Sequence, residues 1–171
     1  MKTTIHLIAA LVCMLLSTTV TQAQNALRSV PEHLAELLSQ EKASGVINNN
    51  GIAAYLDTLG FKKVDSESDK TDLTYVKQLQ KGSSEEVVFI KLTIGFKVSA
   101  NGIKTRFISV TADDKPLLLW VISKLKDFGL FQTEGVGDCI DMKGKGLTAG
   151  TSPNSVTLGY QMQEAKTEKK L

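Results

Sequence analysis

The acidic segment at residues 65–72 has the residue types and spacing that best fit metal chemistry. Calcium binds several hard oxygen ligands at close spacing. Asp65, Glu67 and Asp69 stand at positions 1, 3 and 5, which are the first three ligand positions of an EF-hand-like loop. Lys70 stands where the sharp turn needs glycine, and Val76 stands where a glutamate should close the site. The segment is therefore either a weak calcium site or a solvated connection, and its carboxylates are Asp65, Glu67, Asp69 and Asp72.

Nucleophilic and phosphate chemistry have little support in the sequence. His33 and Cys139 are the only histidine and cysteine after residue 23, and one of each does not make a zinc ligand set. No motif surrounds either residue, and we interpret Cys139 as a small apolar residue buried in a strand. The glycine-rich residues 143–152 lack the spacing of a phosphate-binding loop and are expected to join two strands as a hairpin loop.

A basic sheet face is the candidate binding surface. Alternation places Lys91, Thr93 and Lys97 on one face of the strand predicted at residues 86–98. It also places Lys104 and Arg106 together on one face of the strand predicted at residues 103–111. If these faces align, the open side of the sheet is basic and carries hydroxyl groups, with Thr157 and Gln161 contributed by the last strand. The alternative is an ordinary solvated sheet face. The candidate binding residues are Lys91, Thr93, Lys97, Lys104 and Arg106.

The predicted basic face, together with the single histidine, the single cysteine and the lack of a nucleophile motif after residue 23, favours a non-enzymatic binding or protein-interaction module. Its expected partner is a protein, a peptide or an anionic polymer outside the cytoplasm, and no cofactor is expected apart from the calcium considered above. The alternative is a cell-envelope enzyme with a carboxylate acid/base pair, because carboxylates distant in sequence can meet in space. Candidates for such a pair are Asp113, Asp138 and Asp141.

The N-terminal residues are typical of a signal peptide. Lys2 gives a positive start, residues 5–16 are mostly apolar, and small residues precede a cleavage site after Ala23. The apolar run is shorter than the roughly 20 residues that span a bilayer. Apolar residues flank Cys13, which argues against a lipoprotein. We therefore expect a periplasmic or secreted protein that begins at Gln24.

The composition excludes some partners. The chain has 20 basic and 18 acidic residues, and removing Lys2 with the leader leaves 19 against 18. A net charge near +1 gives no general attraction to nucleic acid. No second apolar stretch is long enough for a transmembrane span; the longest, residues 117–122, lies within an amphipathic helical pattern.

Periodicity and capping residues predict three helices and about five strands. Ser29 with Glu32 caps the first helix, one of Asn48–Asn50 caps the second, and Asp113 or Asp114 caps the third. Glycines at 45, 60 and 129 end these helices. The predicted strands are residues 73–80, 86–98, 103–111, 138–143 and 155–162.

The expected fold is a single α+β domain with helices packed on one face of an antiparallel sheet. The domains are a signal peptide at 1–23, a folded domain at 24–163 and a charged tail at 164–171. Similar helix ends at 57–61 and 126–131 leave internal duplication open. The expected core is Val88, Ile90, Leu92, Ile94, Phe96, Leu118, Val121, Ile122, Leu125, Val156, Leu158 and Tyr160.

Two resemblances rest on this layout and on the leader. The order of helices and strands resembles that of β-lactamase-inhibitor-like and other small exported α+β proteins. The short leader with Lys2 near its start and Gln24 after the cleavage site resembles the leaders of small secreted proteins of Bacteroidetes. Neither resemblance supplies a motif, so neither implies site residues.

Overall fold

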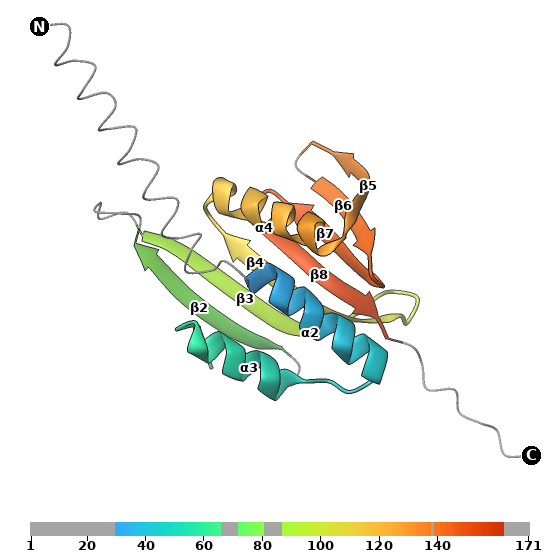
Figure 1. Ribbon diagram of the computed structural model, residues 1–171, viewed down its shortest axis with the longest axis horizontal. Helices are drawn as coiled ribbons and strands as arrows, with labels where there is room; N and C mark the ends of the chain where they lie inside the picture. Colours follow the sequence, from blue (N-terminus) through green and yellow to red (C-terminus); the bar gives the residue numbers. More distant parts are fainter. Residues whose placement is uncertain (1–29, 66–71, 81–86, 138, 163–171) are drawn as a thin grey trace, which may run out of the picture.

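The computed structural model describes residues 30–65, 72–80, 87–137 and 139–162 (Figure 1). The expected signal peptide, the Ser29 cap and the expected charged tail lie outside these residues. Among the described residues, no helix is long and apolar enough to cross a membrane.

Three helices are described: α2 (Val30–Ser44), α3 (Asn49–Thr58) and α4 (Lys115–Phe128). Asn48 caps α3 by accepting a hydrogen bond from the Gly51 amide, and Asp114 caps α4 by accepting one from the Leu117 amide. The predicted caps of these two helices are thus confirmed, because short polar side chains satisfy amides that have no partner within the helix.

The last turns of α3 and α4 have the same geometry. The Phe61 amide donates to the Leu56 carbonyl, and the Leu130 amide donates to the Leu125 carbonyl. The intervening glycines, Gly60 and Gly129, have positive φ values of 76° and 110°. These are Schellman ends, in which a left-handed glycine turns the chain and the next apolar residue packs back onto the helix.

One antiparallel sheet contains all the described strands, in the order β1-β2-β3-β4-β8-β7-β6-β5. The strand order makes two halves, β1 to β4 and β5 to β8, which join where β4 pairs with β8. Each half is a meander that follows a helix, α3 in the first and α4 in the second. The strands are β1 (Lys62–Lys63), β2 (Leu73–Gln80), β3 (Val87–Val98), β4 (Lys104–Ala112), β5 (Phe131–Val136), β6 (Cys139–Gly144), β7 (Leu147–Ser152) and β8 (Ser155–Gln161).

The prediction of about five strands is wrong, since the sheet has eight. β1 has only two residues, and every residue of β5 is exposed, so neither shows an alternating pattern. β7 lies within the segment predicted to be a glycine-rich loop. Leu147 and Ala149 are buried at alternate positions of this strand, but the small residues of the segment, including Gly150, make that alternation too weak to recognise in the sequence. Only Lys145 and Gly146 form the turn between β6 and β7.

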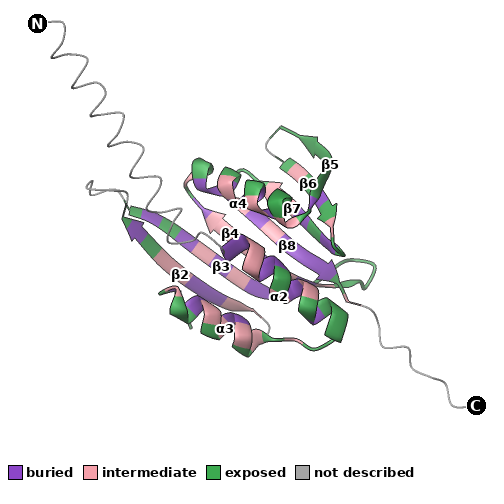
Figure 2. Cartoon of the chain, viewed as in Figure 1, coloured by how far each residue is buried: buried purple, intermediate pink, exposed green. Residues whose placement is uncertain are grey.

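The helices cover one face of the sheet, and the core lies between them (Figure 2). The predicted core residues are buried, except that Phe96 is only half-buried near the end of β3. Lys77 of β2 lies on this same face, and its Nζ donates to the Leu59 carbonyl just after α3. Burial lowers the pKa of Lys77.

The first helix packs beside the third, as its apolar stripe predicts. Leu117 of α4 is buried, and Trp120 is half-buried against the core beside residues of α2. Lys124 of α4 reaches Glu32 of α2, with 3.5 Å between Nζ and Oε1. The wide apolar surface of α4 is therefore covered by both the sheet and a neighbouring helix.

Candidate functional site

The face of the sheet opposite the described helices is the candidate site, and we call it the open face. Residues directly opposite each other in paired strands share a face, so the register identifies its members. On β3, the residues that alternate with the core residues belong to the open face. They are Phe89, Lys91, Thr93, Gly95 and Lys97. The last four of these residues pair on β4 with Thr111, Ser109, Phe107 and Thr105, in that order.

Hydroxyl side chains line up across the open face. Thr74, Thr93, Ser109 and Thr157 are successive register partners on β2, β3, β4 and β8, and we call them the hydroxyl row. The Ser109 Oγ and Thr157 Oγ1 atoms are 2.9 Å apart, which makes a hydrogen bond. Thr74 is buried, whereas Thr93, Ser109 and Thr157 are half-buried. These three neighbouring hydroxyl groups offer both donors and acceptors to a polar partner.

The predicted basic surface is divided between the two faces, which corrects the expected alignment. Lys91, Thr93 and Lys97 lie on the open face, where Lys97 pairs with Thr105. Arg106 pairs with Phe96 on the helix-covered face and is fully buried. Lys104 is exposed on the same side as Arg106, with its Nζ 4.4 Å from the centre of the Phe96 ring.

Arg106 is the centre of a buried polar cluster that sequence reasoning missed. Its Nε donates to Glu41 Oε2 at 3.0 Å, and its Nη2 donates to Asn49 Oδ1 at 2.6 Å. The Asn48 amide donates to the other Glu41 oxygen at 2.8 Å. The cluster joins α2, the start of α3 and β4, so it holds the fold rather than a ligand.

Tyr160 completes this cluster from β8. Its hydroxyl lies 3.5 Å from Glu41 Oε2. Burial raises the pKa of Tyr160, and the nearby Glu41 carboxylate raises it further. A signal for the cluster was present in the sequence, because Glu41 continues the apolar stripe of Leu34 and Leu38 and Arg106 continues that of Ile108 and Val110.

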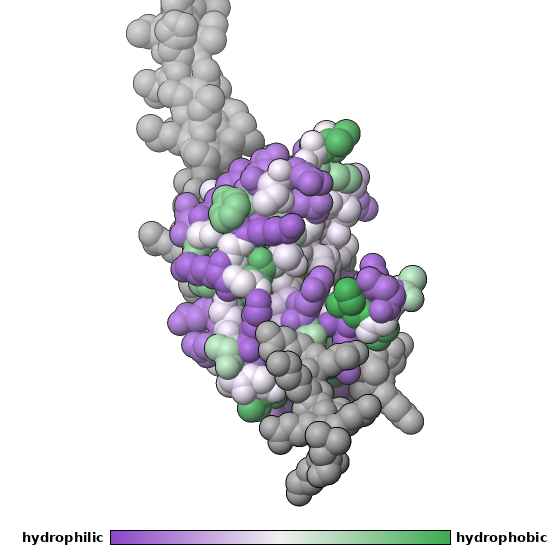
Figure 3. All heavy atoms as spheres, turned by 90° about the vertical axis from the view of Figure 1, so that its right-hand side faces the viewer, coloured by the Kyte–Doolittle hydropathy of each residue, from purple (hydrophilic) through white to green (hydrophobic). Residues whose placement is uncertain are grey.

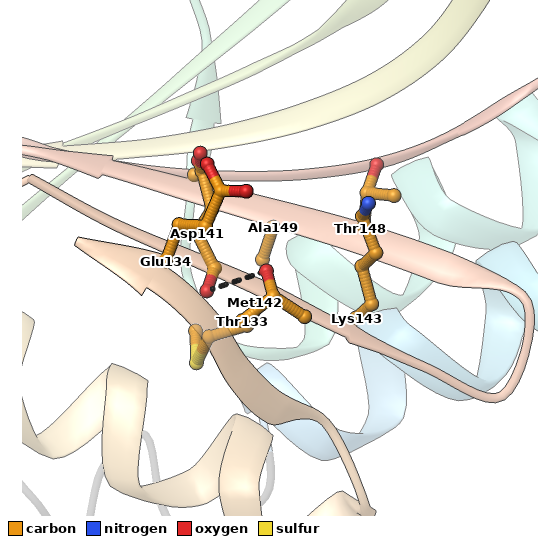
Figure 4. A pocket seen from close by; sticks show the side chains of 8 residues that line it. Thr133, Glu134, Asp141, Met142, Lys143, Thr148 and Ala149 are labelled. Carbon is orange, nitrogen blue, oxygen red and sulfur yellow. Dashed lines mark hydrogen bonds between the residues drawn. The ribbon is translucent and has the colours of Figure 1, made fainter.

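Two carboxylates extend the hydroxyl row toward the edge of the sheet. From Thr157 the register continues through Gly150 on β7 to Asp141 on β6 and Glu134 on β5. In Figure 4, Glu134, Asp141, Lys143 and Thr148 point to the side away from the helices, and they line a hollow of about 220 Å³.

This hollow is open and polar. The Thr133 hydroxyl donates to the Asp141 carbonyl at its rim, with an oxygen–oxygen distance of 3.3 Å. Of the other carboxylates considered for acid/base chemistry, Asp113 is exposed before α4 and Asp138 lies outside the described residues. The hollow is smaller than the roughly 300–1,000 Å³ of ligand pockets, so it favours surface contact over enclosure of a small substrate.

Two of the four proposed calcium ligands, Asp65 and Asp72, are among the described residues, and both contact other groups of the protein. Asp65 Oδ1 pairs with Lys63 Nζ at 2.9 Å, and Asp72 Oδ1 accepts a hydrogen bond from the Phe96 amide at 3.2 Å. Glu67 and Asp69 lie outside the described residues. In the part of the chain that the structure describes, no three His, Cys, Asp or Glu side chains are grouped to hold a metal ion.

His33 and Cys139 occupy surface positions. The His33 ring stands 4.2 Å from the Tyr55 ring, centre to centre, which links α2 to α3. Cys139 begins β6 and is exposed, which corrects its expected burial. It is adjacent to Val136 in the register and belongs to the β5–β6 end of the sheet.

Comparison with known proteins gives no match. No family model fits the sequence, no curated protein matches it, and no solved structure matches its fold.

Proposed function

We propose that the protein is an exported, non-enzymatic binding module whose partner is another protein, and that the partner docks on the open face. The observation that carries this proposal is the hydroxyl row, whose half-buried members Thr93, Ser109 and Thr157 lie in register on three neighbouring strands of the face opposite the helices. The scaffold beneath it is rigid, because the other face of the same strands is packed in the core.

The charges of the open face favour a protein over an anionic polymer. Exposed Lys97 and Lys143 on this face are accompanied by exposed Glu134 and Asp141. A polyanion would be attracted by the lysines and repelled by the carboxylates. Surfaces that bind proteins reversibly are of this mixed kind, with polar groups around a few apolar contacts.

Apolar contacts are available at one end of the open face. Phe89 is 54% exposed, and the neighbouring Val87 is also exposed on the same side of β3. The side of the molecule at the right of Figure 1 likewise carries hydrophobic residues as small separate spots among hydrophilic ones (Figure 3). The few apolar side chains of the open face support reversible docking there, since obligate interfaces are more apolar.

Site-specific photocrosslinking in the exporting cell tests the proposal. Benzoylphenylalanine placed at Lys97 or Thr148 reports on the open face, and the same group at Ser123 or Lys126 of α4 reports on the helix layer. All four side chains are exposed, so each substitution is accommodated. We expect a discrete protein adduct from the open-face positions and none from α4.

A second change identifies the row itself as the contact. Ser109→Glu puts an unpaired charge in the middle of the row and should reduce the adduct from Lys97 by about tenfold. Ser123→Glu on α4 is the matched control and should leave the adduct unchanged. Adducts only from α4, equal adducts from both faces, or no adduct at any position would overturn the proposal.

Export is a separate part of the proposal and has its own test. The signal-like residues 1–23 support it, and cleavage after Ala23 would leave Gln24 as the first residue. Mass spectrometry of the protein from the envelope and culture medium should find that N-terminus. Recovery of intact Met1, or of a lipid on Cys13, would contradict it.

An envelope enzyme is the second candidate, and the register pairing of Glu134 with Asp141 is the observation that favours it. Paired carboxylates can act as acid and base in glycoside hydrolysis. A panel of chromogenic glycosides tests this candidate. Turnover that is lost in Asp141→Asn and retained in Asp127→Asn, an exposed carboxylate on α4, would establish it in place of the binding module.

A further inference from the structure

The helix-covered face of the sheet becomes exposed at one end. Arg106 of β4 is fully buried beside Glu41 of α2. Lys104, two residues earlier on the same face of β4, is exposed, and its register partner on β3, Val98, is 64% exposed. The β3–β4 hairpin and the last residues of β8 lie together at this end (Figure 1). The strands therefore extend beyond the helices and leave the last side chains of this face in contact with solvent.

A hollow of about 480 Å³ lies at this end of the sheet. Its volume is within the roughly 300–1,000 Å³ of ligand pockets. The apolar side chains that line it are Val98, Ile103 and Met162. Met162 directly follows β8 and is half-buried, and its amide donates to the Lys104 carbonyl at 2.9 Å. Because methionine is flexible and its neighbours are branched, these side chains can fit an aliphatic chain closely.

The polar groups of the hollow favour an anion. Lys104 is the only charged residue of its described lining. The Phe96 ring, 4.4 Å from the Lys104 Nζ atom, keeps the ammonium group beside the hollow, and Lys104 forms no ion pair with a carboxylate among the described residues. Asn101 Oδ1 accepts a hydrogen bond from the Ser99 hydroxyl, which leaves the Asn101 amide nitrogen as a donor.

We propose that this hollow binds a small amphiphile with an anionic head group, of which a medium-chain fatty acid is the simplest example. The carboxylate pairs with Lys104 and accepts a hydrogen bond from Asn101. The aliphatic chain lies against Val98, Ile103 and Met162. A cationic head group would face the ammonium group of Lys104 with no carboxylate in the described lining to offset the repulsion.

This site is separate from the proposed function. Lys104 and Val98 belong to the helix-covered face, whereas the protein partner is proposed to dock on the open face. The hollow is also open to solvent, so its affinity for a ligand of this size should be modest. The two proposals can therefore fail independently of each other.

NMR titration of the isotope-labelled exported protein with decanoate, at concentrations below micelle formation, tests the inference. We expect the amide signals of Gly102 and Ile103 to shift and that of Thr148 to stay in place, with a dissociation constant of about 1 mM or tighter. Decyltrimethylammonium has a chain of similar length and a cationic head group, and it should bind at least about tenfold more weakly.

Two variants test the charged and the apolar parts of the site. Lys104→Gln removes the cation and should raise the dissociation constant of decanoate at least about tenfold. Its matched control is Lys143→Gln, because Lys143 is an exposed strand lysine outside the hollow. Val98→Glu brings a carboxylate to the apolar lining and should abolish measurable binding. Its control is Val136→Glu, since Val136 is 86% exposed on β5.

Circular dichroism checks that each variant is folded, and all four replaced side chains are exposed. Both controls should bind decanoate as the wild type does. Absence of shifts at the hollow in the wild type would overturn the inference. Binding that Lys104→Gln and Val98→Glu leave unchanged, or that the controls weaken equally, would also overturn it. Equal binding of decyltrimethylammonium would show that the hollow does not select an anion, which contradicts the proposal.

Discussion

Arg106 of β4 and Glu41 of α2 form a buried ion pair, with 3.0 Å between Nε and Oε2 and almost no exposure of either side chain. The Arg106 Nη1 atom has no hydrogen-bond partner among the described residues, and the guanidinium carbon lies 4.9 Å from the centre of the Phe96 ring. A charged residue expected at a binding surface is thus part of the contact between helix layer and sheet.

Removing one partner of this pair should be strongly destabilising. Arg106→Met leaves the Glu41 carboxylate buried without its cation, and Glu41→Leu leaves the guanidinium without its anion. Each change should lower the free energy of unfolding by about 3–5 kcal/mol, measured by urea denaturation.

The double variant distinguishes the ion pair from simple packing. Glu41→Leu with Arg106→Met leaves no buried charge, so its cost should be at least about 2 kcal/mol smaller than the sum of the single costs. Lys126→Met, an exposed change on α4, is the control and should have little effect. Additive costs would show that the two charges do not stabilise each other.

Local signals in the sequence predict the helices and the central strands of this fold. The caps Asn48 and Asp114 and the terminal glycines act through neighbouring backbone groups, so they can be identified without knowing the tertiary structure. The alternation from Val88 to Ile94 likewise identifies the buried face of β3. These features need only the period of one element.

The candidate site could not be predicted to the same extent, because it depends on register between elements. Alternation places Lys97 and Arg106 each on a face of its own strand, and only the pairing of Phe96 with Arg106 shows that those faces differ. The hydroxyl row depends on four strands meeting in register. The exposed β5 has no apolar alternation because it lies at the edge and buries neither face.

Gly159 should tolerate no side chain. A Cβ atom there would lie 2.4 Å from the Arg106 carbonyl oxygen on the neighbouring strand. Gly159→Ala should therefore lower stability by about 1–3 kcal/mol, because backbone must move to relieve the overlap. Gly150→Ala on β7 is the matched control, since its Cβ would meet only the Asp141 carboxylate at 3.4 Å, an ordinary contact. Equal melting temperatures for the two variants would contradict this prediction.

Stability should fall at alkaline pH because of buried tyrosines. Burial raises the pKa values of Tyr160 and Tyr75 above the ordinary value of 10.0. The folded state thus favours the protonated phenols, and this stabilisation is complete below pH 10.0 and is lost as the pH rises through the raised values. Lys77 acts in the opposite direction, because its pKa is lowered and the unfolded chain binds its proton more readily.

Urea unfolding at several pH values between about 8 and about 11 measures this dependence. The Tyr160→Phe variant should lose less stability over that range than the wild type, because it has one fewer phenol to ionise. Some loss should remain from Tyr75. An identical pH profile for the two proteins would show that Tyr160 ionises equally in the folded and unfolded states.

Trp120 and Leu119 of α4 are adjacent in sequence and should respond differently to the same substitution. Trp120 is half-buried against the core where α2 meets α4, whereas Leu119 is 54% exposed. Trp120→Glu should cost about 1–3 kcal/mol of unfolding free energy, because it removes apolar packing and brings a charge to the helix contact. Leu119→Glu should change it by no more than about 0.5 kcal/mol. Thermal and urea unfolding of the two variants provide the comparison, and an equally small effect of both would mean that the α2–α4 contact does not depend on Trp120.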